Sequence, residues 1–158
     1  MSLVEIWFDG CCEPVNPGGY AGWGAALFVD GTRVWENSVL VGHGKDMSNN
    51  VAEYSGCLAA MEEAIRRGFN KGKHKIVIRG DSKLVINQLP LLWKRNGGLY
   101  YPFFQKAREA YTKLGGKDYV PKGRVTLEWI PREENSIADE LSKRALKEAG
   151  VKFRIQPE

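Results

Sequence analysis

The 158-residue chain lacks the sequence features of a membrane-spanning, secreted or disulfide-stabilised protein. No apolar run approaches the roughly 20 residues that a transmembrane helix needs, and the N-terminal stretch MSLVEIWFDG has no signal-peptide pattern. The three cysteines are an odd number and two are adjacent, so they do not make a disulfide framework. We therefore expect an intracellular, cytoplasmic protein in a reducing compartment.

Histidines are also scarce, and this bears on the segment FDGCCEPVNPGGY near the N-terminus. A zinc site at Cys11 and Cys12 would need further ligands at suitable spacing, which Cys57, His43 and His74 do not supply. The Asn-Pro-Gly-Gly sequence lacks the lysine and the following helix of a P-loop. We expect reduced thiols at positions that need small residues, and a turn between antiparallel strands.

The length of the chain suggests one domain, spanning residues 1–158, that is large enough to bury a substantial core. There is no internal repeat, low-complexity tract or linker. The net charge of +4 and the isoelectric point near 9.0 favour a polyanionic partner only weakly. Acidic residues gathered at one place in such a basic chain would suit divalent metals acting on a phosphate backbone.

Hydrophobic periodicity predicts strands that alternate with helices after an opening meander. The predicted strands are 3–9, two within 19–42 that join at Asp30-Gly31, 73–81 and 124–130. The predicted helices are 48–67, 82–89, 101–114 and 136–150. This order predicts an α/β fold with a mixed sheet covered by helices.

Two aspartates, Asp9 and Asp81, are predicted to lie at the C-terminal ends of apolar strands. Ligand sites in open α/β sheets lie just beyond such strand ends. Turn formation, or for Asp81 the capping of the next helix, is the commoner role of an aspartate after a strand when each residue is taken alone.

Two further acidic residues lie near predicted helix starts. Asn50 and Glu53 resemble a capping box, and Ser136 and Asp139 are cap-like in the same way. Small residues follow Glu53 at steps of four, seven and eleven, so its helix can approach the sheet closely and direct this carboxylate toward it. Capping explains two of the four acids, but not why all four fall at comparable positions of one sheet.

If the four carboxylates converge, their mutual repulsion requires cations, because like charges a few ångströms apart raise one another's pKa. Oxygen-only ligands favour hard cations such as magnesium or manganese over zinc. Two such ions also supply what phosphodiester hydrolysis needs.

Four blocks of the chain resemble ribonuclease HI, in the order and at the approximate spacing of that family. The blocks are FDGCCEPVNPGGYAGWG, SNNVAEYSGCLAAMEEA, IRGDSKLVINQL and WIPREENSIADELSKRA. The resemblance implies an RNase H-like fold with a five-stranded mixed sheet, three antiparallel strands followed by two parallel ones. It also implies an endonuclease that cuts the RNA strand of RNA–DNA hybrids with two Mg²⁺ ions, or Mn²⁺, leaving 3′-hydroxyl and 5′-phosphate ends.

The resemblance also assigns roles to residues. Asp9 would bridge both metals, Glu53 and Asp81 would hold one, and Asp139 the other. The implied substrate contacts are Gly10, Cys11, Cys12, Asn16, Ser48, Asn49, Asn50 and Ser82.

The chain departs from the common family pattern in two places. The loop before Asp139 has no histidine, and Arg132 stands there as in the archaeal-like branch, where it is a candidate for part of the histidine's task. The long basic protrusion after Gln88 is missing or shortened. We expect a monomer, and two rivals stay open: a catalytically silent hybrid-binding module, and another nuclease of the superfamily that acts on DNA.

Overall fold

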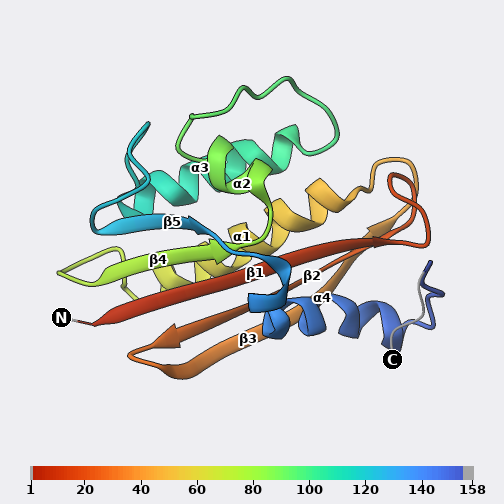
Figure 1. Cartoon of the computed structure of the whole chain (residues 1–158), viewed down its shortest axis with the longest axis horizontal. Helices are drawn as coiled ribbons and strands as arrows, with labels where there is room; N and C mark the ends of the chain where they lie inside the picture. Colours follow the sequence, from red (N-terminus) through yellow and green to blue (C-terminus); the bar gives the residue numbers. More distant parts are fainter. Residues whose placement is uncertain (1, 155–158) are drawn as a thin grey trace.

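The structure, a computed structural model, describes residues 2–154 and contains one five-stranded sheet with the strand order β3-β2-β1-β4-β5 (Figure 1). Three strands form an antiparallel meander and two run parallel to β1. The strands are β1 (Leu3–Glu13), β2 (Tyr20–Val29), β3 (Thr32–His43), β4 (Lys75–Gly80) and β5 (Val125–Trp129). The predicted mixed α/β sheet, antiparallel and then parallel, is confirmed.

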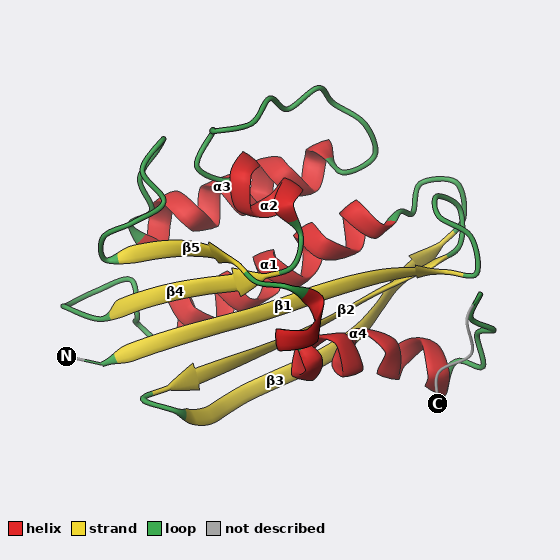
Figure 2. Cartoon of the chain, viewed as in Figure 1, coloured by secondary structure: helices red, strands yellow, loops and turns green. Residues whose placement is uncertain are grey.

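Helices cover both faces of the sheet (Figure 2). They are α1 (Asn49–Arg66), α2 (Lys83–Gln88), α3 (Tyr101–Leu114) and α4 (Ser136–Glu148), with a 3₁₀ turn η1 (Arg132–Glu134) before α4. On one face α1 packs against β1 and β2 and is itself covered by α3, whereas α4 packs on the other face against β2, β1 and β3. No described helix has both the length and the apolar character required to cross a bilayer.

Small residues allow α1 to lie close to the sheet. The predicted stripe of Cys57, Ala60 and Ala64 is fully buried in the core that α1 forms with β1 and β4. At Gly10, a Cβ atom would lie 2.5 Å from the backbone nitrogen of Glu53, so only glycine fits there without moving α1. This contact fixes the start of α1 against β1.

The tight turn between β2 and β3 was predicted correctly. Asp30 and Gly31 have φ angles of 48° and 84°, the left-handed values that a two-residue hairpin turn requires. The predicted end of the first strand at Asp9 was wrong, because β1 continues to Glu13. Its pairing with β2 extends to Glu13↔Tyr20, while its pairing with β4 stops at Phe8↔Gly80.

Candidate functional site

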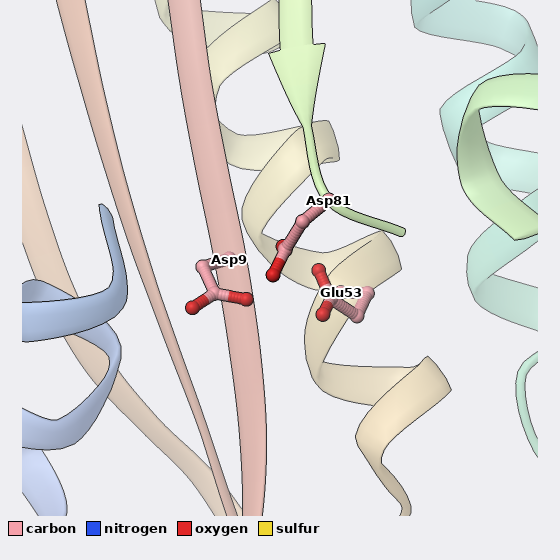
Figure 3. Close-up of side chains that lie close together, drawn as sticks. All are labelled: Asp9, Glu53 and Asp81. Atoms are coloured by element: carbon pink, nitrogen blue, oxygen red, sulfur yellow. The ribbon is translucent and has the colours of Figure 1, made fainter. Parts of the chain in front are cut away.

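Three carboxylates from separate segments meet near the C-terminal end of β4. Asp9 lies in β1, Glu53 in α1 and Asp81 directly after β4, and their side chains point toward one another in Figure 3. One carboxylate oxygen from each residue lies within 4.8 Å of the other two. The prediction that these acids converge is confirmed for these three residues.

The pairing of β4 with β1 ends just before Asp9, and this leaves space in which the three side chains meet. The last paired residue of β4 is Gly80, opposite Phe8, so β4 does not extend alongside Asp9. Asp81 then leads into α2, whose N-terminal cap is the hydroxyl of Ser82, which accepts a hydrogen bond from Val85 N at 3.2 Å. The capping role considered for Asp81 therefore belongs to its neighbour.

The capping of α1 by Ser48 also leaves the carboxylate of Glu53 available for the site. Ser48 is the N-cap and its hydroxyl accepts from Val51 N at 3.2 Å. The alternative role of Glu53 in a capping box with Asn50 is therefore excluded, because the helix starts two residues earlier than that pairing requires. Glu53 instead lies just after the first turn of α1 and points toward Asp9 and Asp81 (Figure 3).

Burial and mutual repulsion raise the proton affinity of two of the acids. Asp9 is 5% exposed, and burial, followed by the negative charge of Asp81, raises its pKa from 3.8 to about 8. Burial and then the charges of Asp9 and Asp81 hold the pKa of Glu53 well above its usual value. The Oε2 atom of Glu53 is buried and has no hydrogen-bond partner among residues 2–154. These oxygens suit a hard divalent cation, which would offset both the burial of the charged carboxylates and their mutual repulsion.

Asp139 lies in the same cleft but outside the group of three. Its Oδ2 accepts from Lys143 Nζ at 3.2 Å, and its Oδ1 lies 3.7 Å from Nη2 of Arg132. The alternative capping arrangement of Asp139 with Ser136 is excluded, because Asn135 is the N-cap of α4. Arg132 is 68% exposed and lines the cleft beside Asp139.

The carboxylates form the wall of a cleft of about 260 Å³. Five of the predicted substrate contacts also line it: Gly10, Cys11, Cys12, Asn16 and Asn49. Asn16 and Asn49 are joined, since Oδ1 of the first accepts from the backbone N–H of the second at 2.9 Å. Three other predicted contacts, Ser48, Asn50 and Ser82, are not among the lining residues.

All three cysteines are free thiols. The thiol of Cys11 donates to Ser142 O at 3.3 Å and that of Cys12 donates to Val15 O at 3.2 Å. Burial raises the pKa of Cys11 to about 12 and also raises that of Cys12, so both thiols stay protonated at neutral pH. They act here as small packing groups.

Sequence reasoning missed the groups that hold Asp81 in place. Asn135 is almost fully buried, and its Nδ2 donates to Phe8 O at 2.9 Å and to Oδ1 of Asp81 at 3.3 Å. The indole Nε1 of Trp129 donates to the backbone carbonyl of Asp81 at 3.1 Å. Nothing local in the sequence indicates these long-range bonds. The ion pair of Asp139 and Lys143 was also missed, although their i, i+4 spacing is a signal that could have found it.

The sheet order and the carboxylates at the point where β1 and β4 separate define an RNase H-like fold. The reverse transcriptase-like family model matches residues 8–145. The crystal structure of RNase H1 from Halobacterium salinarum is 32% identical, with a TM-score of 0.75, and covers 92% of this chain and 98% of that one. The chain therefore belongs to the ribonuclease H family.

Further comparisons agree with this family. A ribonuclease HI of Halobacterium salinarum is 35% identical over 147 residues, which are 92% of this chain and 65% of the relative. The structure of LC11-RNase H1 in complex with an RNA/DNA hybrid has a TM-score of 0.77 and 26% identity, covering 92% of this chain and 98% of that one. The chain spans 32% of the length of the mycobacterial relatives that it matches at 29% identity.

Proposed function

We propose that this protein is a metal-dependent endoribonuclease that hydrolyses the RNA strand of RNA–DNA hybrids and leaves 3′-hydroxyl and 5′-phosphate ends. The observation that carries the proposal is the buried group of Asp9, Glu53 and Asp81, whose oxygens lie within 4.8 Å of one another in an open cleft. Membership of the ribonuclease H family and the similarity to an RNase H1 bound to hybrid support the substrate class.

The residues present fit two divalent cations, Mg²⁺ or Mn²⁺. The donors are carboxylate oxygens, and the buried Oε2 of Glu53 lacks a partner within the described residues. In the proposed arrangement Asp9 contacts both ions, Glu53 and Asp81 hold one, and Asp139 holds the other. When bound, such a pair activates a water molecule and neutralises the charge that develops on the attacking and leaving oxygens.

The chain's own groups orient these ligands. Nδ2 of Asn135 donates to Oδ1 of Asp81 at 3.3 Å, and the backbone N–H of Gly10 donates to Oδ1 of Asp9 at 2.9 Å. These bonds restrict the rotation of the two carboxylates. Lys143 and Arg132 neutralise Asp139, and Arg132 takes the place of the loop histidine beside that carboxylate.

The nucleic acid would lie along the cleft residues that follow Asp9. Backbone groups from Gly10 to Cys12, which line the cleft, would face RNA 2′-hydroxyls, and the hydrogen-bonded Asn16 and Asn49 would also contact the duplex. Ser48, Asn50 and Ser82 complete the proposed contact set outside the cleft wall. Recognition by shape and by the 2′-hydroxyl is the usual way in which proteins read duplexes that contain RNA.

The test is cleavage of a hybrid labelled separately on its RNA and DNA strands, with Mg²⁺ or Mn²⁺. We expect only the RNA strand to be cut, and Asp9→Asn and Asp81→Asn to abolish turnover while the fold is retained. Full activity in either variant would contradict the assigned mechanism. Hybrid binding without turnover in any divalent metal would indicate a silent binding module, and cleavage of DNA with the hybrid left intact would indicate another nuclease.

A further inference from the structure

A third basic residue lines the described cleft and comes from the segment that follows α4. The backbone after Phe153, whose side chain is buried, places Arg154 against the end of β1. Its Nε donates to Oε2 of Glu13 at 2.8 Å and its Nη2 donates to the carbonyl of Cys12 at 2.8 Å. The guanidinium is therefore held by two bonds to residues 142 and 141 positions away in sequence.

These bonds leave most of the guanidinium available. Arginine carries five N–H donors, and the two bonds use one on Nε and one on Nη2. The side chain of Arg154 is 52% exposed and lines the cleft, whereas that of its partner Glu13 is only 14% exposed. A fixed, half-exposed guanidinium with donors that bond no other residue among 2–154 is the geometry that suits bidentate contact with a phosphate.

The charges around the cleft show why a cation is needed at this place. The acidic group repels a phosphodiester backbone, and two of the three cationic residues that line the cleft, Arg132 and Lys143, are already paired with Asp139. Arg154 is paired with Glu13, not with Asp139, and Glu13 lies four residues beyond Asp9 along β1. At about 3.3 Å per residue this separation is roughly 13 Å, the span of a few nucleotides.

We propose that Arg154 binds a backbone phosphate of the nucleic acid a few nucleotides from the cleaved bond, with Glu13 as the residue that orients its guanidinium. This inference rests on the proposed function and names a subsite of it. The competing role is that Arg154 only neutralises Glu13 and tethers the segment after α4.

The experiment is a double-mutant cycle on hybrid binding. Affinities for a labelled RNA–DNA hybrid are measured from about 50 to 200 mM salt in an Asp81→Asn background, which prevents turnover. The proteins compared carry R154A, E13Q or both. R154K is added because lysine keeps the positive charge but lacks the planar guanidinium that can make two parallel hydrogen bonds to one phosphate. The matched control is R144A, since Arg144 is 50% exposed, pairs with Glu36 at 3.3 Å and does not line the cleft.

We expect R154A to weaken binding about tenfold at low salt and to reduce the salt slope by about one. The same loss should appear in the E13Q background, because glutamine keeps an oxygen that can accept from Nε of Arg154 but removes the charge that Arg154 would neutralise. R154K should be intermediate with the slope retained, and R144A should have little effect. Melting temperatures identify any variant whose fold is damaged. For such a variant, the KM and kcat of R154K in the otherwise natural chain provide the readout, and KM alone should rise.

Loss of the R154A effect in the E13Q background would overturn the inference, since Arg154 would then act only by neutralising Glu13. An unchanged salt slope would overturn it too. These outcomes are distinguishable from failure of the proposed function, in which the natural sequence itself would neither bind nor cut the hybrid.

Discussion

Replacing Asp9 with asparagine should stabilise the metal-free protein while abolishing its catalytic activity. Asp9 is buried beside Asp81, and its pKa rises from 3.8 to about 8. A raised pKa of an acid means that the folded state holds a proton that the unfolded state releases. Stability is therefore lost progressively as pH rises from about 3.8 to about 8, and the whole penalty is present above pH 8.

The size of the effect follows from this rise. At about 1.4 kcal/mol per pH unit, the full penalty above pH 8 is about 6 kcal/mol, and at pH 5 it is about 2 kcal/mol. Asparagine has nearly the same shape and carries no charge, so Asp9→Asn should recover most of this free energy. For a chain of this length that is about 10–20 °C in melting temperature at pH 8.5.

The assay is thermal unfolding of both proteins in EDTA between pH 5 and pH 9, repeated with Mg²⁺. The advantage of Asp9→Asn should grow with pH in EDTA. Added Mg²⁺ should raise the melting temperature of the natural sequence and have little effect on the variant, because the ion binds the charged carboxylate. Equal or lower stability of the variant at pH 8.5 in EDTA would refute the argument that burial and repulsion act on Asp9.

Three other substitutions test the surroundings of the site. Asn135→Ala should lower stability by about 2–3 kcal/mol in urea unfolding, since it leaves a buried backbone carbonyl unpaired and frees Asp81 to rotate. Gly10→Ala should cost about 1–3 kcal/mol and weaken Mg²⁺ binding in calorimetry, because the added Cβ would lie 2.5 Å from backbone of α1. Replacing Cys11 and Cys12 together with serine should keep most of the hybrid-cleaving activity, since both thiols serve as donors to carbonyl oxygens. A large loss of kcat/KM in that last variant would show that the thiols matter for catalysis.

Local signals in the sequence predicted most of the secondary structure. The hairpin turn at Asp30, the helix from Tyr101 to Leu114 and the close approach of α1 all follow from turn residues, periodicity and small side chains. The end of β1 could not be predicted in this way. That strand continues past Asp9 because β2 pairs with it as far as Glu13, and the pairing depends on residues distant in sequence.

As with the secondary structure, the parts of the site that depend on neighbouring residues could be predicted, whereas contacts between distant segments could not. Asp9 and Asp81 were selected as predicted strand ends and Glu53 as a residue near a helix start, and the structure brings the three together. For Asp9 the reason was wrong, because β1 continues past it and only its pairing with β4 stops there. The serine caps beside two of them were misassigned, because several neighbouring polar residues compete for one cap. Asn135 and Arg154 act on segments more than 50 residues away, so no spacing in the sequence could indicate their contacts.

The central claim is that the buried carboxylates and Asp139 together form one two-metal site. Anomalous diffraction from a crystal soaked in Mn²⁺ measures this directly. We predict two peaks about 3.5–4 Å apart, one between Asp9, Glu53 and Asp81 and one between Asp9 and Asp139, with Asp139 released from Lys143. A single peak away from these residues, or none, would contradict the account.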